Sequence, residues 1–116
     1  MPNIAYPAFI HGGWRDLAFE HFREGITVHW LLKGGPAEPS VAILNYRPGA
    51  GVPRHRHFAL ETIVVLEGTQ SDENGDYLPG SVILNLVGTE HSVWTKDGCV
   101  VLIQWNLPVV ILDQTK

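Results

Sequence analysis

The chain has 116 residues, of which 45% are hydrophobic and 17% charged, a balance that argues against intrinsic disorder. Eight Lys and Arg residues against twelve Asp and Glu residues give a net charge of −4, which argues against a nucleic-acid-binding protein. The single cysteine, Cys99, excludes an internal disulfide bond, and no apolar run is long enough to cross a membrane. We therefore expect one cytoplasmic domain over residues 1–116, with neither nucleic acid nor membrane as a partner.

Most of the predicted elements are short β-strands, because apolar and β-branched residues alternate with others between Gly and Pro residues. Residues 17–24 are the exception: Leu17 and Phe22 suit one side of a turn or two, so we expect a short helix there. Further along the chain, Asn74-Gly75 predicts a tight turn between two strands. Such a pattern is typical of an all-β sandwich or barrel. Strands are expected at residues 26–30, 41–47, 61–67, 81–87 and 100–105.

Three histidines and a glutamate are the candidate chemical groups. Residues 54–57 read Arg-His-Arg-His, so in a strand His55 and His57 face one side while the two arginines face the other. Glu61 opens an apolar strand, where a carboxylate is costly unless it is paired or bound to a metal. His91 lies in a second apolar strand setting. Three imidazoles and one carboxylate can bind one divalent ion such as Fe, Mn, Zn, Ni or Cu.

These residues also have ordinary interpretations. Glu61 can be the ion-pair partner of Arg54 or Arg56, and the Arg-His-Arg-His segment can be a basic patch for a phosphate. Alternation argues against the patch, because it places the two residue types on opposite faces. The remaining histidines are interpreted as surface residues or as hydrogen-bonded core residues: His11, His21 and His29.

The spacing of the candidate ligands resembles the first conserved motif of the cupin superfamily. The motif is matched at every defining position, with five, one, three and six residues between its members. Those members are Gly49, His55, His57, Glu61 and Gly68.

The second cupin motif is matched at Gly80, Gly88 and His91, whereas Leu86 and Thr95 replace its proline and asparagine. Neither replacement removes a metal ligand. The resemblance covers residues 40–106 and implies a single small cupin barrel, also called a double-stranded β-helix or jelly roll. It also implies that one divalent metal ion is bound by four side chains: His55, His57, Glu61 and His91.

A closer resemblance, to the ChrR-type cupin domain, is carried by segments 65–69, 72–73 and 77–81, by His91 and by Gly98-Cys99. That domain occurs in zinc-binding anti-sigma factors and also alone, in relatives that include dioxygenases acting on hydroxyacetophenone or diketone compounds. The resemblance therefore implies a metal-dependent, dioxygenase-like oxygenase acting on a small carbonyl or phenolic compound. The alternative is a non-catalytic zinc module that binds or senses a ligand. An open coordination shell suits the enzyme and a closed tetrahedral zinc suits the module.

A small-molecule ligand would need apolar walls beside the metal. Alternation places Ile63 and Val65 on the Glu61 face and Val93 on the His91 face, and Ile103 and Trp105 are candidates for the opposite wall.

The resemblance also implies a homodimer that pairs through an edge strand. Large aromatic residues commonly fill small β cores, so three tryptophans are interpreted as core or dimer-contact residues rather than substrate contacts. They are Trp30, Trp94 and Trp105.

Overall fold

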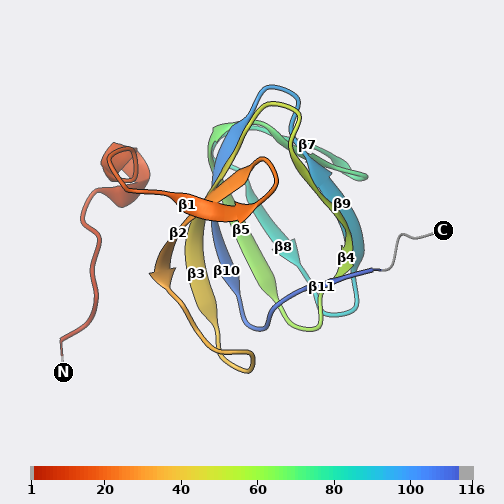
Figure 1. The fold of residues 1–116 in the computed structure, drawn as a ribbon, viewed down its shortest axis with the longest axis horizontal. Coiled ribbons are helices and arrows are strands. Elements are labelled where there is room, and N and C mark those ends of the chain that lie inside the picture. The colour runs from red at the N-terminus through yellow and green to blue at the C-terminus, as the bar shows by residue number, and fades with distance from the viewer. Residues whose placement is uncertain (1, 113–116) are drawn as a thin grey trace.

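In the computed structural model, which describes residues 2–112, the chain folds into two antiparallel β-sheets (Figure 1). The predicted all-β barrel is therefore confirmed. The six-stranded sheet contains, in spatial order, β1 (Glu20–Arg23), β2 (Ile26–Leu32), β3 (Ser40–Tyr46), β10 (Cys99–Trp105), β5 (Glu61–Gly68) and β8 (Val82–Asn85). The five-stranded sheet contains β11 (Val110–Ile111), β4 (Gly51–Arg56), β9 (Glu90–Trp94), β6 (Gln70–Asp72) and β7 (Gly75–Tyr77).

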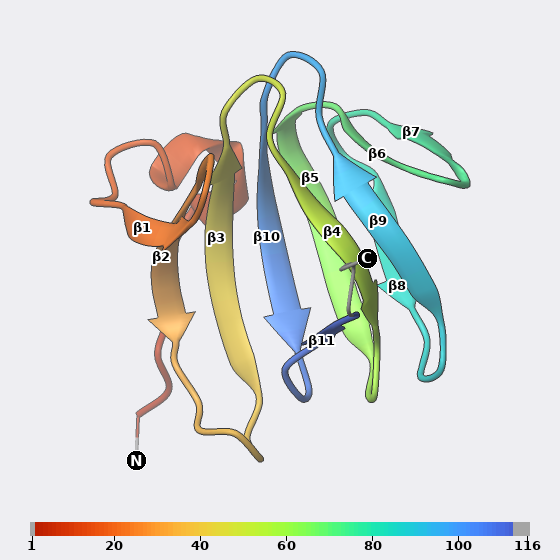
Figure 2. The ribbon, with the colours of Figure 1, turned by 45° about the vertical axis from the view of Figure 1, so that its right-hand side comes forward.

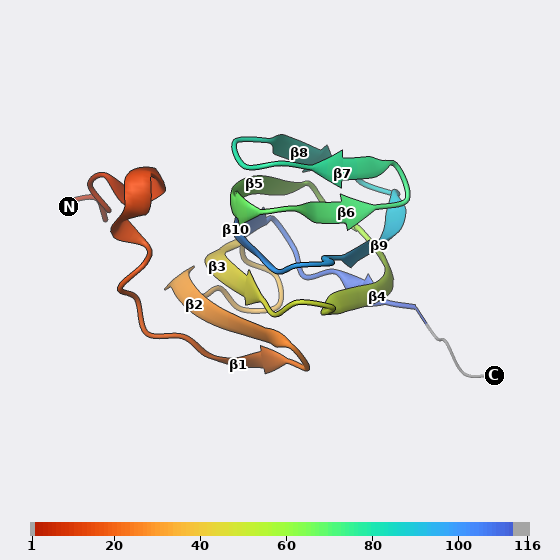
Figure 3. The same cartoon turned by 90° about the horizontal axis from the view of Figure 1, so that it is seen from above.

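The two sheets face each other and enclose one interior. Figure 2 shows the strands of the larger sheet side by side with β4 and β9 in front of them, and Figure 3 shows the same layers from above. Along β10, Val101 and Ile103 are buried in the interior core, while Leu102 packs in a second cluster on the outer face. Period-two alternation thus sorts the residues of β10 into an inner and an outer row.

Glycine-containing turns join the strands at the predicted places. Asp72 pairs with Gly75 across the β6–β7 hairpin, so the tight turn predicted at Asn74-Gly75 is confirmed. Gly68 ends β5 with a φ of 72°, and a Cβ atom there would lie 2.1 Å from the carbonyl oxygen of Gly98. A residue with a side chain at position 68 would therefore be both strained and sterically blocked.

The helix predicted at residues 17–24 is wrong. Residues Glu20–Arg23 form β1, an edge strand that pairs with β2. Tertiary packing overrides the local pattern, because the ring of Phe22 contacts Trp30 and Trp105 at centroid distances of 6.0 and 6.1 Å. A helix at this position would remove both the strand pairing and this contact.

A short helix does occur earlier in the chain, at η1 (Phe9–Gly13). It is closed by the hydrogen bond from the backbone N–H of Gly13 to the carbonyl oxygen of Ala8, at 3.3 Å. Phe9 and Trp14 pack against Ile43 on the outer face of the larger sheet, so this segment covers part of that face. Within residues 2–112 no helix is long and apolar enough to span a membrane.

Candidate metal centre and adjoining cavity

Four side chains with potential metal-binding atoms meet inside the barrel. His55 on β4 lies directly opposite His91 on β9, His57 follows the end of β4, and Glu61 begins β5. All four residues are at most 3% exposed, and their candidate ligand atoms lie within 4.8 Å of one another. The strand register thus brings together the four residues selected from the sequence, which we call the metal centre. The other histidines lie outside this group: His11, His21 and His29.

Backbone oxygens fix the orientation of two of the imidazoles. Nδ1 of His55 lies 2.9 Å from the carbonyl oxygen of Pro53, and Nδ1 of His57 lies 3.1 Å from that of Thr89. Because a carbonyl oxygen only accepts hydrogen bonds, the network assigns the proton to Nδ1 in both rings. In the neutral form of each ring the lone pair is therefore on Nε2, the nitrogen that a metal can bind. The hydrogen bond from Nε2 of His57 to Glu61 belongs to the protonated ring, whose proton a metal would displace.

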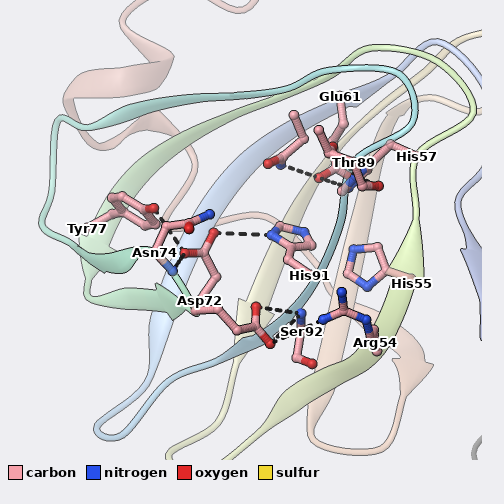
Figure 4. A network of polar contacts seen from close by, with 12 residues as sticks. Arg54, His55, His57, Glu61, Asp72, Asn74, Tyr77, Thr89, His91 and Ser92 are labelled. Carbon is pink, nitrogen blue, oxygen red and sulfur yellow. Dashed lines mark hydrogen bonds and ion pairs between the residues drawn. The ribbon is translucent and has the colours of Figure 1, made fainter.

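The buried carboxylate of Asp72 fixes the orientation of the third imidazole, that of His91. Oδ2 of Asp72 lies 3.1 Å from Nδ1 of His91, and its Oδ1 accepts hydrogen bonds from the Tyr77 hydroxyl and the Asn74 backbone N–H (Figure 4). The sequence placed Asp72 beside a hairpin turn and in a segment that resembles the ChrR-type domain, but it indicated no role for this residue at the metal centre. The contact depends on the pairing of β6 with β9, through Ser71 and Trp94, which local spacing does not reveal.

Glu61 is held by two neighbours inside the barrel. Its Oε1 accepts a hydrogen bond from the side-chain amide of Asn85 at 2.8 Å and lies 3.2 Å from Nε2 of His57. Asn85 was not recognised in the sequence, because it reaches Glu61 only through the pairing of β5 with β8.

The two arginines of the Arg-His-Arg-His segment lie on the opposite face of β4. Both Arg54 and Arg56 are exposed and form ion pairs with Glu90 on the neighbouring strand β9. Glu61 is therefore not the ion-pair partner of either arginine.

Burial and charge act in opposite directions on the metal-centre residues. Burial disfavours the charged forms of both His57 and Glu61, but their hydrogen bond and opposite charges outweigh it. As a result the pKa of His57 is raised and the pKa of Glu61 is lowered. Burial lowers the pKa of His55, which favours the neutral imidazole that a metal requires.

The donor atoms fit a divalent metal ion. Nε2 of His91 is buried and has no hydrogen-bond partner within residues 2–112, although its Nδ1 is paired. A buried nitrogen without a partner is costly unless something binds it. Three imidazole nitrogens and one carboxylate oxygen suit Fe, Mn, Zn, Ni or Cu. The cluster can therefore hold one metal ion, whose identity the donor set leaves open.

A cavity of about 520 Å³ lies beside the metal centre, and His55 and Glu61 form part of its wall. Val65 lies instead in the packed core and is absent from the cavity wall. The wall includes the other four residues selected as pocket candidates: Ile63, Val93, Ile103 and Trp105.

Three aromatic rings form one side of this cavity. Phe22, Trp30 and Trp105 lie with ring centroids 6.0–6.1 Å apart, and all three line the open space. The sequence interpretation of Trp30 as a core or dimer-contact residue therefore misses its place on the cavity wall. Trp94 is different, since it is 43% exposed on β9 and does not line the cavity. Phe22 was missed because its segment was predicted to be helical.

Comparison with known proteins identifies the architecture. A sequence model of the family described as the ChrR cupin-like domain matches residues 10–107. No curated protein matches the chain.

Solved structures give the same fold. A chain from the complex of SigE with the anti-sigma ChrR from Rhodobacter sphaeroides is 25% identical, with a TM-score of 0.72 over 85% of this chain and 56% of that one. The acetylacetone dioxygenase from Acinetobacter johnsonii is 18% identical, with a TM-score of 0.75 over 83% of this chain and 72% of that one. The polyketide cyclase RemF from Streptomyces resistomycificus is 20% identical, with a TM-score of 0.73 over 100% of this chain and 88% of that one.

Proposed function

The chain belongs to the ChrR cupin-like domain family, and from this premise we propose that it is a metal-dependent, dioxygenase-like enzyme acting on a small carbonyl or phenolic compound. In this proposal one divalent ion is bound by four ligands: His55, His57, Glu61 and His91.

The observation that carries this proposal is the cavity beside the metal centre. A purely structural metal site needs no open space next to its ligands, whereas a catalytic site must admit a substrate. Here about 520 Å³ of mostly apolar space reaches His55 and Glu61. A carbonyl or phenolic oxygen can therefore approach the metal centre while the carbon skeleton lies against apolar walls.

The residues around the metal centre have separable tasks in this proposal. A redox-active divalent ion supplies Lewis-acid and electron-transfer chemistry when bound. Ile63, Val93 and Ile103 exclude water from the space in which the substrate lies. Asn85 keeps the Glu61 carboxylate in place through the 2.8 Å hydrogen bond, so that its charge balances part of the cation.

Two successive measurements test the proposal. Elemental analysis of untagged protein should find close to one iron, manganese, nickel or copper ion per chain. The protein reconstituted with Fe(II) should then consume oxygen in the presence of β-diketones or hydroxyacetophenones, a choice supported by the likeness to an acetylacetone dioxygenase. A reconstituted protein that consumes no oxygen with any compound of either class contradicts the enzyme proposal.

The second candidate is a zinc-containing module without turnover. The likeness to a chain from the SigE–ChrR complex favours it. The present chain spans 56% of the length of that chain. Four ligands can close a tetrahedral shell around zinc and leave no position for substrate. Stoichiometric zinc without oxygen uptake would support the module and reject the oxygenase.

The homodimer expected from the sequence is also a proposal. β8 is an edge strand of the larger sheet, and its outward side chains Val82 and Leu84 are 63% and 58% exposed. A second copy that packs there would cover this apolar edge. Light scattering should give twice the chain mass, and Leu84→Lys should shift it to that of one chain. A monomeric wild-type protein contradicts the proposal.

A further inference from the structure

A β-bulge directs an arginine toward the cavity. In β1 the pairing register shifts between His21 and Arg23, so that Arg23 lies opposite Ile26. Ile26 is an inward-facing core residue, and residues directly opposite each other in a sheet share a face. The bulge therefore allows two consecutive residues, Phe22 and Arg23, both to line the cavity.

This arginine has no counter-charge from the protein. Within residues 2–112 no carboxylate lies within 4.0 Å of its guanidinium group, in contrast to Arg15, Arg54 and Arg56, which all form ion pairs. Arg23 is also half-buried, so part of its hydration is lost. A half-buried cation on the wall of an open cavity is suited to binding an anionic group.

Tyr46 adds a second hydrogen-bond donor at the same end of the cavity. It lies opposite Ile26 on the next strand, and it lines the cavity although the residue is only 4% exposed. Its hydroxyl has no hydrogen-bond partner within residues 2–112. Burial raises the pKa of Tyr46, so the phenol keeps its proton and can donate it in a hydrogen bond.

The cavity extends along the barrel from this end to the metal centre. On β10, Cys99 pairs with Tyr46, while Trp105 at the other end of the strand pairs with Glu61. The backbones of Tyr46 and Glu61 thus lie toward opposite ends of the strands, but the Tyr46 side chain reaches back toward the metal centre, since the charge of Glu61 is among the causes that raise the pKa of Tyr46. Because both Tyr46 and Glu61 line the cavity, a single small ligand can face both of them.

From these observations we propose that the ligand of this cavity is a flat aromatic ketone that carries a carboxylate on the side of the ring opposite to the ketone. Arg23 and Tyr46 bind the carboxylate, and the rings of Phe22, Trp30 and Trp105 contact the flat middle. A cavity of about 520 Å³ is within the range that holds drug-sized ligands and is larger than a five-carbon diketone requires. The inference rests on the proposed function for the end that faces the metal.

Calorimetry with two probes tests this inference on metal-loaded protein. The probes are 4-acetylbenzoate and 4-methylacetophenone, which differ only in a carboxylate or a methyl group at the far end. The wild-type protein should bind 4-acetylbenzoate about tenfold more tightly, as expected for hydrogen bonds to a charged group. Arg23→Gln and Tyr46→Phe should each remove most of that difference and leave the affinity for 4-methylacetophenone unchanged.

Matched variants provide the controls. Arg47→Gln changes the net charge equally at an exposed position, and Tyr6→Phe removes a hydroxyl outside the cavity. Equal affinity of the wild-type protein for the two probes overturns the inference. An equal loss of affinity for both probes in Arg23→Gln also overturns it, because Arg23 would then only protect an edge strand. Probe discrimination without oxygen uptake would reject the proposed enzyme activity and keep the inference. Oxygen uptake without discrimination between the two probes would support the proposed enzyme activity and overturn the inference.

Discussion

The metal centre and the cavity beside it differ in whether their polar side chains have hydrogen-bond partners within the protein. In the metal centre each imidazole is held by a further oxygen atom, as Thr89 holds His57 and Asp72 holds His91. In the cavity the hydroxyl of Tyr46 has no partner within residues 2–112. Polar groups with partners keep a fixed geometry, whereas polar groups without partners are available to a ligand that exchanges. The difference indicates a resident ion on one side and a transient organic ligand on the other.

The largest expected effect comes from removing a ligand of the metal centre. His57→Ala should lose most of the bound metal, because three ligands hold a divalent ion more weakly than four. The barrel should stay folded, since its apolar core is unchanged. Elemental analysis and circular dichroism measure the two effects, and His21→Ala, at an exposed position, is the control. Unchanged metal content in His57→Ala would show that the ligand assignment is wrong.

A second experiment separates a ligand from the residue that positions it. Asp72→Asn keeps the shape of the side chain but removes its charge, and one amide oxygen cannot replace both carboxylate oxygens. Metal affinity should fall by about 10- to 100-fold, the usual effect of losing such a partner of a ligand histidine. Competition with a chromophoric chelator measures it.

The control for this experiment is Asp97→Asn, which removes an equal charge from an exposed loop. An Asp72→Asn protein with wild-type affinity would mean that His91 is oriented by the strands alone.

Residues of the two cupin motifs were predictable from the chain, including His91 of the second motif, whereas residues that reach the site only through strand pairing were not. His55, His57 and Glu61 lie within one short segment, where period-two alternation and a known motif act together. Asp72 and Asn85 reach the same site through the pairing of β6 with β9 and of β5 with β8. Such long-range pairing depends on the whole topology rather than on local spacing.

The cavity wall was predicted less completely than the metal centre, for the same reason. The β5, β9 and β10 wall was predicted from alternation, apart from Val65, which lies in the core. The β1 wall was missed because residues 17–24 look helical on one side and because a bulge breaks the alternation at Arg23. Bulges change which residues share a face, so a period-two pattern cannot reveal them.

A smaller effect is expected from pH, which should change the affinity for the metal ion. A metal competes with the proton on each ligand, and the pKa of His57 is raised above its ordinary value of 6.5 by Glu61. Metal affinity should therefore begin to fall above pH 6.5 on acidification, by about tenfold per pH unit for one displaced proton. Glu61 adds no competition in this range, because its pKa is lowered from 4.5. Titrations between pH 8 and pH 5 measure the onset, and an onset below pH 6.5 contradicts this expectation.

The smallest effect tests whether the cavity is open in solution. Val65 and Val93 are the same residue type and are similarly buried, at 1% and 4% exposure, but only Val93 lines the cavity. Val65→Ala loses two carbon atoms and leaves a new void in packed surroundings, so it should lower the free energy of unfolding by about 2.5 kcal/mol. Val93→Ala enlarges a space that already exists, so it should cost about 1.5 kcal/mol, which is close to the transfer energy alone.

Urea denaturation measures the two variants against wild type, and equal slopes are required so that the free energies can be compared. The difference of about 1 kcal/mol is the contribution of the new void around position 65. If Val93→Ala costs as much as Val65→Ala, the wall of the cavity is packed in solution as tightly as the core. The interior would then have room for a metal ion but not for an organic ligand, and the contrast between its two regions would disappear.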